Sequence, residues 1–202
     1  PVVEEQAAFV AQFKRIAGLH PPGYPAQADG DAIVGHDTEG WLLTAQLPAG
    51  VAIHDESPEM YVAAARLFFT RFVEARNYWY PSHTHHQGDS YATRLVYDLC
   101  ATWLFRRMGA GDVFSREQQF MPYHYFYNLR PDGQQIRRGD SFADTRTGRK
   151  QTILLLDGSY YRDPFVLDML DGKHFVHQLP VFHEVFELLV RPTGAGKRPL
   201  SE

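Results

Sequence analysis

The fold class of this chain is indicated most clearly by residues 57–73, SPEMYVAAARLFFTRFV. Ser57 is a typical N-cap residue, Pro58 is favoured in a first helical turn, and the acid of Glu59 suits the positive end of a helix dipole. The apolar residues that follow cover nearly the whole circumference of the predicted helix. We therefore expect a helix that is covered on more than one side, as an inner helix of a two-layer helical array would be.

Helical patterns separated by short breaks recur along the rest of the chain. Alternating polar and apolar runs flanked by Asn-Gly or Asp-Gly turns are hard to find. Ser115 and Gln118 form a capping-box pattern before one of the helices, whereas residues 151–156, QTILLL, fit a strand equally well. The pattern favours an all-α domain built from helical hairpins. Helices are expected at residues 4–19, 41–47, 57–73, 88–108, 120–127, 150–171 and 179–190.

The composition places the chain among folded proteins and excludes few partners. Its 202 residues are 44% hydrophobic and 14% aromatic, which is enough for a core, and residues 1–190 are expected to form one helical domain. Residues 191–202 are polar and rich in Gly and Pro, which predicts a linker or tail. The net charge of -4 and the scattered Lys and Arg residues do not indicate a nucleic-acid partner. No apolar run approaches the roughly 18 residues of a membrane helix.

Cys100 is the single cysteine, so an internal disulfide is excluded. It lies on an expected apolar helix face, and no distinctive cysteine motif surrounds it. We interpret it as a small buried hydrophobe rather than as a nucleophile.

Tyr91 is a candidate catalytic residue at the end of residues 76–91, RNYWYPSHTHHQGDSY. Gly88 allows a close approach of the chain, and the helical pattern that follows puts Tyr91 in a first turn, where backbone N–H groups favour a phenolate. Arg94 would stabilise that phenolate further, or would pair with Asp98 four residues later. The alternative is a half-buried tyrosine with a satisfied hydroxyl.

His36 and Glu39 are candidate partners of Tyr91. They stand three residues apart, just before the helical pattern of residues 41–47, so both can project from one end of that helix into a cleft. A tyrosine, a histidine and a glutamate together can remove a carbon-bound proton from a sugar acid and hold its carboxylate. Alternatively, the histidine is a hydrogen-bonded structural residue and the glutamate a helix N-terminal charge.

The densest histidine cluster offers a zinc site as an alternative. His83, His85, His86 and Asp89 lie close together in the sequence, but they lack the further Asp-His ligands of metal hydrolases. We favour a loop of surface or substrate-contacting histidines over a metal site.

Aromatic residues near this loop are candidates for stacking against sugar rings. Core packing is the default for the set Tyr78 to Tyr80 and for the set Tyr123 to Tyr127. Trp79 and Tyr80 are the better carbohydrate candidates because they precede the histidine-rich loop.

Three segments together resemble a known family. They are residues 35–41, GHDTEGW, residues 76–91, and residues 130–140, RPDGQQIRRGD. Their order and spacing are similar to the N-terminal helical domain of the heparinase II/III-like polysaccharide lyases, and the resemblance covers most of residues 1–145.

The resemblance implies an incomplete (α/α) toroid joined to β-sandwich domains, so that this chain would be a fragment of a larger lyase. Such enzymes cleave uronic-acid-containing polysaccharides, here of the heparin or heparan sulfate type, by β-elimination. The family's catalytic histidine, acid and tyrosine fall on His36, Glu39 and Tyr91, and the separation of the first and last (91 − 36 = 55) agrees with the family pattern. No position matches the family's second histidine, nor its zinc site, and both would lie in the β-rich part that follows.

The resemblance also suggests substrate contacts and partners. Arg76, Arg94 and Arg138 are weak candidates for binding sulfate or carboxylate groups, with a surface ion pair as the alternative for each. Together with Trp79, Tyr80 and His86 they make the predicted substrate-binding set. We expect no cofactor or metal on this fragment, a structural zinc in the missing C-terminal part, and a periplasmic or secreted location. The expected partners are an acidic polysaccharide, the remaining lyase domains and, as an alternative to a monomer, a second copy in a homodimer.

Two other functions compete with this interpretation. One is a carbohydrate-binding helical module without catalysis, and the other is a zinc hydrolase that uses His83, His85 and His86. Within the lyase interpretation, alginate or another uronan remains an alternative substrate.

Overall fold

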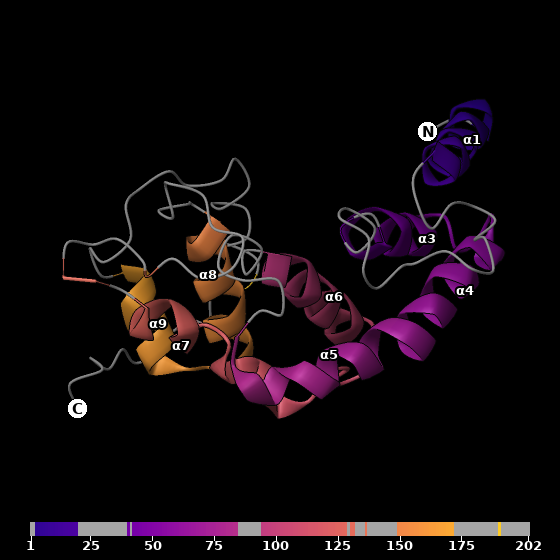
Figure 1. The fold of residues 1–202 in the computed structure, drawn as a ribbon. Helices are drawn as coiled ribbons and strands as arrows, with labels where there is room; N and C mark the ends of the chain where they lie inside the picture. The colour runs from indigo at the N-terminus through magenta and orange to yellow at the C-terminus, as the bar shows by residue number, and fades with distance from the viewer. Residues whose placement is uncertain are drawn as a thin grey trace. The chain divides into compact units, whose positions relative to one another are not determined.

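The computed structural model describes residues 3–19, 40, 42–84, 94–128, 130–131, 136, 149–171 and 190. These residues are mostly helical, and no β-strand occurs among them (Figure 1). The all-α prediction is therefore confirmed for the described part of the chain. The chain divides into two compact units, residues 1–76 and residues 77–202.

The first unit is centred on two packed helices, α3 (Leu47–Ala52) and α4 (Pro58–Leu67). They approach closely at Gly50, where a Cβ atom would lie 2.7 Å from the Cα of Tyr61. A larger residue at this position would push the two backbones apart. The short connection between Ala52 and Pro58 brings the two helices together, as in a helical hairpin.

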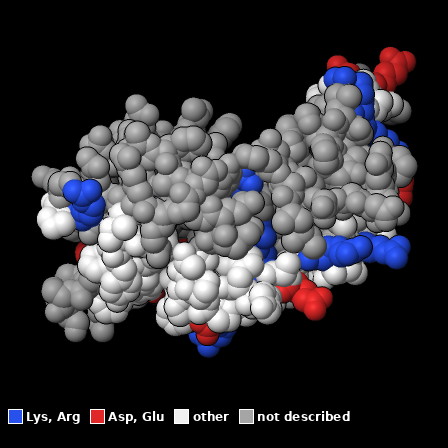
Figure 2. Space-filling model, in the orientation of Figure 1, with Lys and Arg blue, Asp and Glu red and all other residues white. Residues whose placement is uncertain are grey.

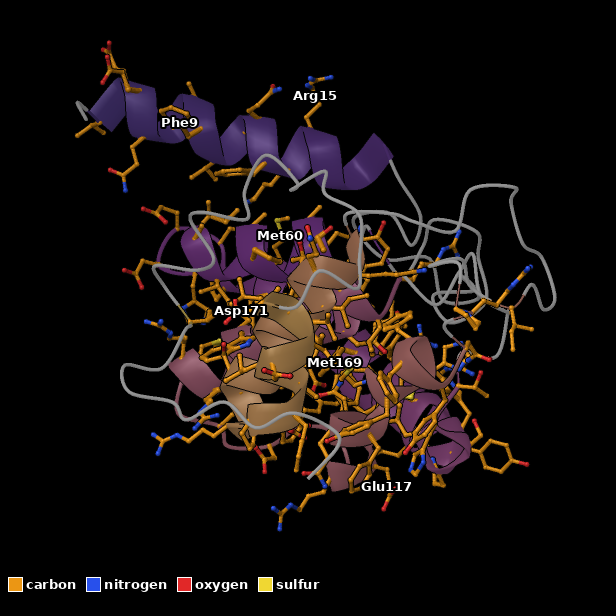
Figure 3. All side chains as sticks on the ribbon, turned by 90° about the vertical axis from the view of Figure 1, so that its left-hand side faces the viewer. Phe9, Arg15, Met60, Glu117, Met169 and Asp171 are labelled. Carbon is orange, nitrogen blue, oxygen red and sulfur yellow. The ribbon has the colours of Figure 1, made fainter. Side chains whose placement is uncertain are left out.

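Helix α1 (Val3–Leu19) confirms the helix predicted for residues 4–19. Its Val10 and Phe13 side chains pack against Ile53 and Met60 of the first unit. Phe9 and Arg15, in contrast, are exposed on α1 (Figure 3). The helix therefore buries one stripe and presents the other to solvent.

The helix predicted for residues 57–73 is confirmed and is longer than expected. Helix α4 continues through the π-helical segment η2 (Phe68–Phe72) into α5 (Val73–Trp79). A second π-helical segment, η1 (Leu42–Gln46), precedes α3 within the pattern predicted at residues 41–47. The aromatic side chains of η2 decide its packing, because Phe68 and Phe72 are fully buried and their rings lie 5.8 Å apart.

The expectation that the helix over residues 57–73 is covered on more than one side is wrong in part. Val62 is 58% exposed and Phe69 is 46% exposed, and Arg66 lies on the same exposed face. These residues recur at a helical spacing of three to four, so they form one solvent-facing stripe. Although apolar residues occur on nearly every side of this helix, one side of it is exposed to solvent.

The start of α4 also differs in detail from the prediction. Ser57 occupies the N-cap position, but its hydroxyl makes no capping bond to the backbone. It donates instead to the carboxylate of Glu59, and this hydrogen bond is the main reason that the pKa of Glu59 is lowered to about 2. The boundary was predicted correctly, whereas the role of the side chain was not.

The second unit is built on α6 (Leu95–Arg107), α8 (Arg149–Tyr161) and α9 (Pro164–Asp171). Helix α8 packs against both α6 and α9 (Figure 1). Trp103 of α6 donates from Nε1 to the carbonyl oxygen of Leu156 at 2.9 Å, and Arg106 donates to that of Tyr160 at 3.0 Å. These bonds tie α6 to α8 over about one turn of each helix, and the Arg106 guanidinium also lies 4.4 Å from the Tyr160 ring centroid.

Helix α6 ends where the sequence predicts, at the Gly-Ala-Gly segment. Gly109 adopts a positive φ of 82°, and its N–H donates to the carbonyl of Arg106 at 3.0 Å. The N–H of Ala110 donates to the carbonyl of Phe105 at 3.0 Å. This pair of bonds is a Schellman motif, which favours glycine at the left-handed position.

Residues 151–156 belong to α8, so the alternative of a strand there is wrong. The helix predicted for residues 150–171 is interrupted, because Arg162 has a φ of 55° and separates α8 from α9. Asp163 then accepts hydrogen bonds from the backbone N–H groups of Phe165 and Val166, which begins α9. The helix predicted for residues 179–190 lies almost entirely outside the described residues.

Residues 115–127 depart most clearly from the prediction. Ser115 makes no side-chain capping bond, and Gln118 is fully buried, so the predicted capping box is wrong. The segment forms a 3-10 helix, η5 (Arg116–Phe120), and then a short α-helix, α7 (Tyr123–Tyr127). Among the described helices, none is long and apolar enough to cross a membrane.

Candidate functional site

The three residues predicted to be catalytic lie outside the described part of the chain. This holds for Tyr91, His36 and Glu39, and also for His86 and Arg138 of the predicted substrate-binding set. Their assignment therefore stays a prediction. The residues that flank the segment carrying Tyr91 and His86 are described on both sides.

A buried hydrogen bond joins the two ends of this segment, residues 85–93. The hydroxyl of Tyr80, in the 3-10 helix η3 (Tyr80–Ser82), donates to Oδ2 of Asp98 at 2.7 Å. Tyr80 precedes the segment and Asp98 lies in α6, which follows it. Both side chains are buried, so water does not compete with this bond. The elements η3 and α6, which flank residues 85–93 in the sequence, are therefore joined to each other.

Gln118 extends this bond into a network. Its Nε2 donates to the Tyr80 hydroxyl at 2.8 Å, while its Oε1 accepts from the hydroxyls of Thr102 at 3.1 Å and Tyr161 at 3.0 Å. The network connects η3, η5, α6 and α8. Buried polar groups that satisfy one another in this way hold a single arrangement of the elements that carry them.

Two of the predicted substrate-binding arginines are buried. Arg76 is 1% exposed and Arg94 is 8% exposed, so the alternative of a surface ion pair is wrong for both. The Arg76 guanidinium lies 4.0 Å above the centroid of the Phe72 ring, a cation–π arrangement. Arg94 occupies the N-cap position of α6 without a side-chain capping bond, directly after the segment that carries Tyr91.

The two predicted carbohydrate platforms differ in exposure. The Tyr80 ring has no exposed surface, so its position is structural and it offers no face to a sugar. Trp79 is half-buried, and its ring packs edge-on against Tyr80 with centroids 4.7 Å apart. The Tyr80 hydroxyl has two hydrogen-bond partners in the interior, so the ring can be buried without leaving its polar group unsatisfied.

A cavity of about 560 Å³ lies beside the start of the same segment. One wall is formed by residues 82–84, which lead directly into residues 85–93. The volume falls within the range of about 300 to 1,000 Å³ that is usual for small-molecule sites. The other wall comes from η5, α7 and the residue after α7: Phe120, Tyr123, His124, Tyr127 and Asn128.

His83 and Glu117 form an ion pair at the rim of this cavity when His83 is protonated. His83 has a left-handed backbone, with a φ of 50°, and its Nε2 lies 2.7 Å from Oε2 of Glu117. The His83 ring also packs against Phe120, with centroids 5.1 Å apart. Glu117 points to the outside of the molecule (Figure 3). His83 thus has a protein partner, while His85 and His86, the other histidines of the zinc alternative, lie outside the described residues.

The other wall combines buried polar groups with exposed rings. Asn128 donates from Nδ2 to the carbonyl oxygen of His124 at 2.6 Å and contacts its Nδ1 at 3.1 Å. Because an amide nitrogen only donates, Nδ1 is the acceptor, and neutral His124 carries its proton on Nε2. Tyr127, by contrast, is 74% exposed. Sequence reasoning named Tyr127 only within an aromatic set and missed His124 and Asn128.

Tyr123 connects the cavity to Asp163, a half-buried acid that interacts with the buried Asp157. Its hydroxyl donates to Oδ2 of Asp163 at 3.0 Å, and burial followed by the Asp163 charge raises the pKa of Tyr123 above its ordinary value. Asp157 is fully buried, and within the described part of the chain neither of its carboxylate oxygens has a hydrogen-bond partner. Burial, with a smaller effect of Asp163, raises the pKa of Asp157 well above its ordinary value. No sequence signal distinguishes Asp157 from a surface acid.

Cys100 is not activated as a nucleophile. Burial, with a smaller effect of the Asp98 charge, raises the pKa of its thiol to about 11. A thiol with such a pKa stays protonated at neutral pH and is a weak nucleophile. Among the described residues, no group of three or more His, Cys, Asp or Glu side chains is arranged to hold a metal ion.

No protein-family model matches the chain, and no curated protein is similar to it.

Proposed function

We propose that this chain is the helical catalytic part of a polysaccharide lyase that cleaves a uronic-acid-containing polysaccharide of the heparin or heparan sulfate type by β-elimination. In this proposal the helices belong to an incomplete (α/α) toroid, and further β-sandwich domains complete the enzyme. The resemblance also places the enzyme in the periplasm or outside the cell. It acts on an extended acidic polysaccharide.

The observation that carries the proposal is the set of residues His36, Glu39 and Tyr91 with their spacing. A tyrosine that acts as both base and acid, with a histidine and an acidic residue, is the chemistry that β-elimination from a uronate requires. The acidic residue follows the histidine by three positions, and the tyrosine follows the histidine by 55 (91 − 36).

The structure around residues 85–93 supports the proposal indirectly. A catalytic tyrosine must be held close to its productive position, since small displacements cost large factors in rate. The Tyr80–Asp98 bond and the Gln118 network hold together η3 and α6, the elements that precede and follow the segment carrying Tyr91. Buried Arg94 lies three residues after Tyr91 in the sequence.

The proposed reaction begins at C5 of the uronate. Glu39 hydrogen-bonds the uronate carboxylate, together with a histidine from the part of the enzyme that follows, and stabilises the charge that builds up when the C5 proton leaves. The Tyr91 phenolate takes that proton, and the electron pair of the C5–H bond forms the C4–C5 double bond. The C4–O bond then breaks, and the departing oxygen receives the proton from Tyr91, which returns to its starting state.

His36 provides for the other epimer. When the C5 proton lies on the opposite ring face, His36 is the base, and Tyr91 still protonates the departing C4 oxygen. The two side chains thus act from opposite sides of the ring. Arg94 and Arg138 stay candidates for sulfate or carboxylate contacts, whereas Arg76 is 1% exposed and has no surface to offer a polysaccharide.

Ultraviolet absorbance tests the proposal directly. The full-length protein is incubated separately with heparin, heparan sulfate and alginate, and the absorbance of new unsaturated chain ends is followed over time. We expect absorbance to rise with heparin or heparan sulfate. A rise with alginate alone would identify alginate rather than heparan sulfate as the substrate. No rise with any uronan would refute the proposal that the protein is a lyase.

A carbohydrate-binding module without catalysis is the second candidate. The aromatic cavity beside residues 82–84 favours it, because binding alone would explain exposed rings such as Tyr127. This candidate predicts oligosaccharide binding in the complete absence of new unsaturated ends. The same absorbance experiment, combined with a binding measurement, separates the two.

A further inference from the structure

Aromatic rings line the cavity beside residues 82–84 and stand at an angle to one another. The centroids of the Phe120 and Tyr123 rings are 6.4 Å apart, and the ring planes are inclined by 53°. Tyr127 lines the same cavity one helical turn after Tyr123, so the two side chains share one face of α7. Phe120 is 38% exposed and Tyr127 is 74% exposed, so a ligand can reach their rings. In Figure 2, the described surface around α7 and α9 belongs mainly to residues other than Lys, Arg, Asp and Glu.

Two carboxylates contact residues that line this cavity. Oδ2 of Asp163 accepts the hydrogen bond of the Tyr123 hydroxyl at 3.0 Å, and Oε2 of Glu117 lies 2.7 Å from Nε2 of His83. When His83 is neutral, its pair with Glu117 carries a net negative charge. A phenol that donates to a carboxylate becomes more electron-rich, which strengthens the negative potential over the face of its ring. These groups therefore favour a positively charged ligand in the cavity.

A trimethylammonium group has the complementary chemistry. Its charge is spread over methyl groups that pack against ring faces, and it has no N–H group that needs an acceptor. Aromatic rings attract such a cation when it lies within about 6 Å of their centroids. The separation of 6.4 Å between the Phe120 and Tyr123 centroids lets one cation lie that close to both rings. The cavity volume of about 560 Å³ suits a small molecule.

We propose that this cavity binds a small soluble compound that carries a trimethylammonium group, of the choline type. The rings of Phe120, Tyr123 and Tyr127 hold the cation, and the carboxylates of Glu117 and Asp163 add negative potential behind them. The inference does not depend on the proposed lyase function, because all of these residues are described and belong to the second unit. It differs from the carbohydrate-binding candidate in the charge of the ligand.

Binding of choline and of its uncharged carbon isostere tests the preference for charge. In the isostere a tert-butyl group replaces the trimethylammonium group, so the shape and the hydroxyl group are kept. Dissociation constants are measured by NMR titration of the full chain. We expect choline to bind about fivefold more tightly or better, the effect of a cation on two ring faces. Failure of choline to bind, or binding of the isostere that is equally tight or tighter, would overturn the proposal.

Tyr127→Leu and Tyr78→Leu locate the binding site. Leucine keeps an apolar side chain but removes the ring face, so Tyr127→Leu should raise the Kd of choline about two- to fivefold. Tyr78 is a matched control because it is 89% exposed and does not line the cavity, and Tyr78→Leu should leave Kd unchanged. Circular dichroism checks that both variants are folded. An unchanged Kd for folded Tyr127→Leu would place choline elsewhere and contradict the proposal.

Glu117→Gln tests the contribution of the carboxylate. Glutamine can still hydrogen-bond to His83 but carries no charge. Because Glu117 is partly exposed, we expect the Kd of choline to rise only about twofold, with no change for the isostere. Glu74→Gln, at an exposed residue that does not line the cavity, removes the same net charge and is the control. A neutral disaccharide that binds and is lost in Tyr127→Leu, without any binding of choline, would favour the carbohydrate-binding candidate instead.

Discussion

The hydroxyl of Tyr80 donates a 2.7 Å hydrogen bond to Oδ2 of Asp98, and these two buried residues stand on either side of the segment that carries Tyr91. The same hydroxyl accepts a 2.8 Å bond from Nε2 of Gln118. The Tyr80 hydroxyl oxygen therefore links three elements, η3, α6 and η5.

Tyr80→Phe should destabilise the protein. The change removes one oxygen atom, so Asp98 and Gln118 each lose one buried hydrogen bond, which costs about 1 to 3 kcal/mol of unfolding free energy. Chemical denaturation followed by circular dichroism measures the change. Tyr78→Phe, at a residue that is 89% exposed, should change the unfolding free energy by less than about 0.5 kcal/mol. Equal stability of the two variants would contradict the central place of the Tyr80–Asp98 bond.

Tyr91→Phe should abolish lyase activity without unfolding the protein. Loss of a group that is both base and acid lowers kcat by about 10²- to 10⁴-fold. The measurement is the initial rate of ultraviolet absorbance increase on heparan sulfate, and Tyr78→Phe again provides the control. Normal activity of Tyr91→Phe would show that another residue is the base and acid, whatever the substrate.

Stability should fall as pH rises above about 4 because of Asp157. Its raised folded pKa means that the folded protein keeps a proton which the unfolded chain loses near pH 4. The free energy of unfolding then decreases by about 1.4 kcal/mol per pH unit up to the folded pKa and stays lowered above it. Asp163, Tyr123 and Tyr161 are the titratable groups that interact with Asp157.

Asp157→Asn removes this dependence. We compare the unfolding free energy of the variant with that of the unsubstituted protein at each pH. This difference should shift in favour of the variant by at least about 1.4 kcal/mol between pH 4 and pH 8. Denaturation at several pH values measures the difference. Asp55→Asn, at a fully exposed side chain, is the control and should leave the pH profile in place. A gain that does not grow with pH would contradict the assignment of Asp157 as a neutral buried acid.

Gly50→Ala should destabilise the first unit although alanine is the better helix former. The new Cβ atom would lie 2.7 Å from the Cα and 2.9 Å from the N of Tyr61, so α3 and α4 must separate. Overpacking of this kind costs about 1 to 3 kcal/mol, against a gain of up to about 1 kcal/mol in helix propensity. Thermal unfolding measures the balance, with Ala52→Ser on the exposed face of α3 as the control. A higher Tm for Gly50→Ala would mean that the two helices are not in close contact.

The sequence was a reliable guide to the existence of helices and a poorer guide to their ends. Residues 57–73 and residues 4–19 are helical because spacing and first-turn chemistry are local properties. The break at Arg162 was missed, since nothing in the preceding residues signals a left-handed conformation there. The capping box at Ser115 failed because burial offered Gln118 three partners in the interior.

The candidate site divides in the same way. The types and spacing of His36, Glu39 and Tyr91 are visible in the sequence, and so is the aromatic richness near residue 125. The pairing of Tyr80 with Asp98 was not visible, because these residues are 18 positions apart and lie in different elements. The cavity was missed for the same reason, since its two walls come from residues 82–84 and residues 120–128.

The sequence by itself determined that this chain is helical, where most of its helices begin, and which residue types are present for chemistry, since each of these depends on neighbours within a turn or two of the chain. Only the tertiary structure decided which polar side chains are buried, as it did for Arg76 and Asp157, and which aromatic rings stay exposed, as it did for Tyr127. The reason is physical. Burial and hydrogen-bond partners are set by elements that meet from distant parts of the chain, and a single residue has no local signal for the neighbour that it will meet.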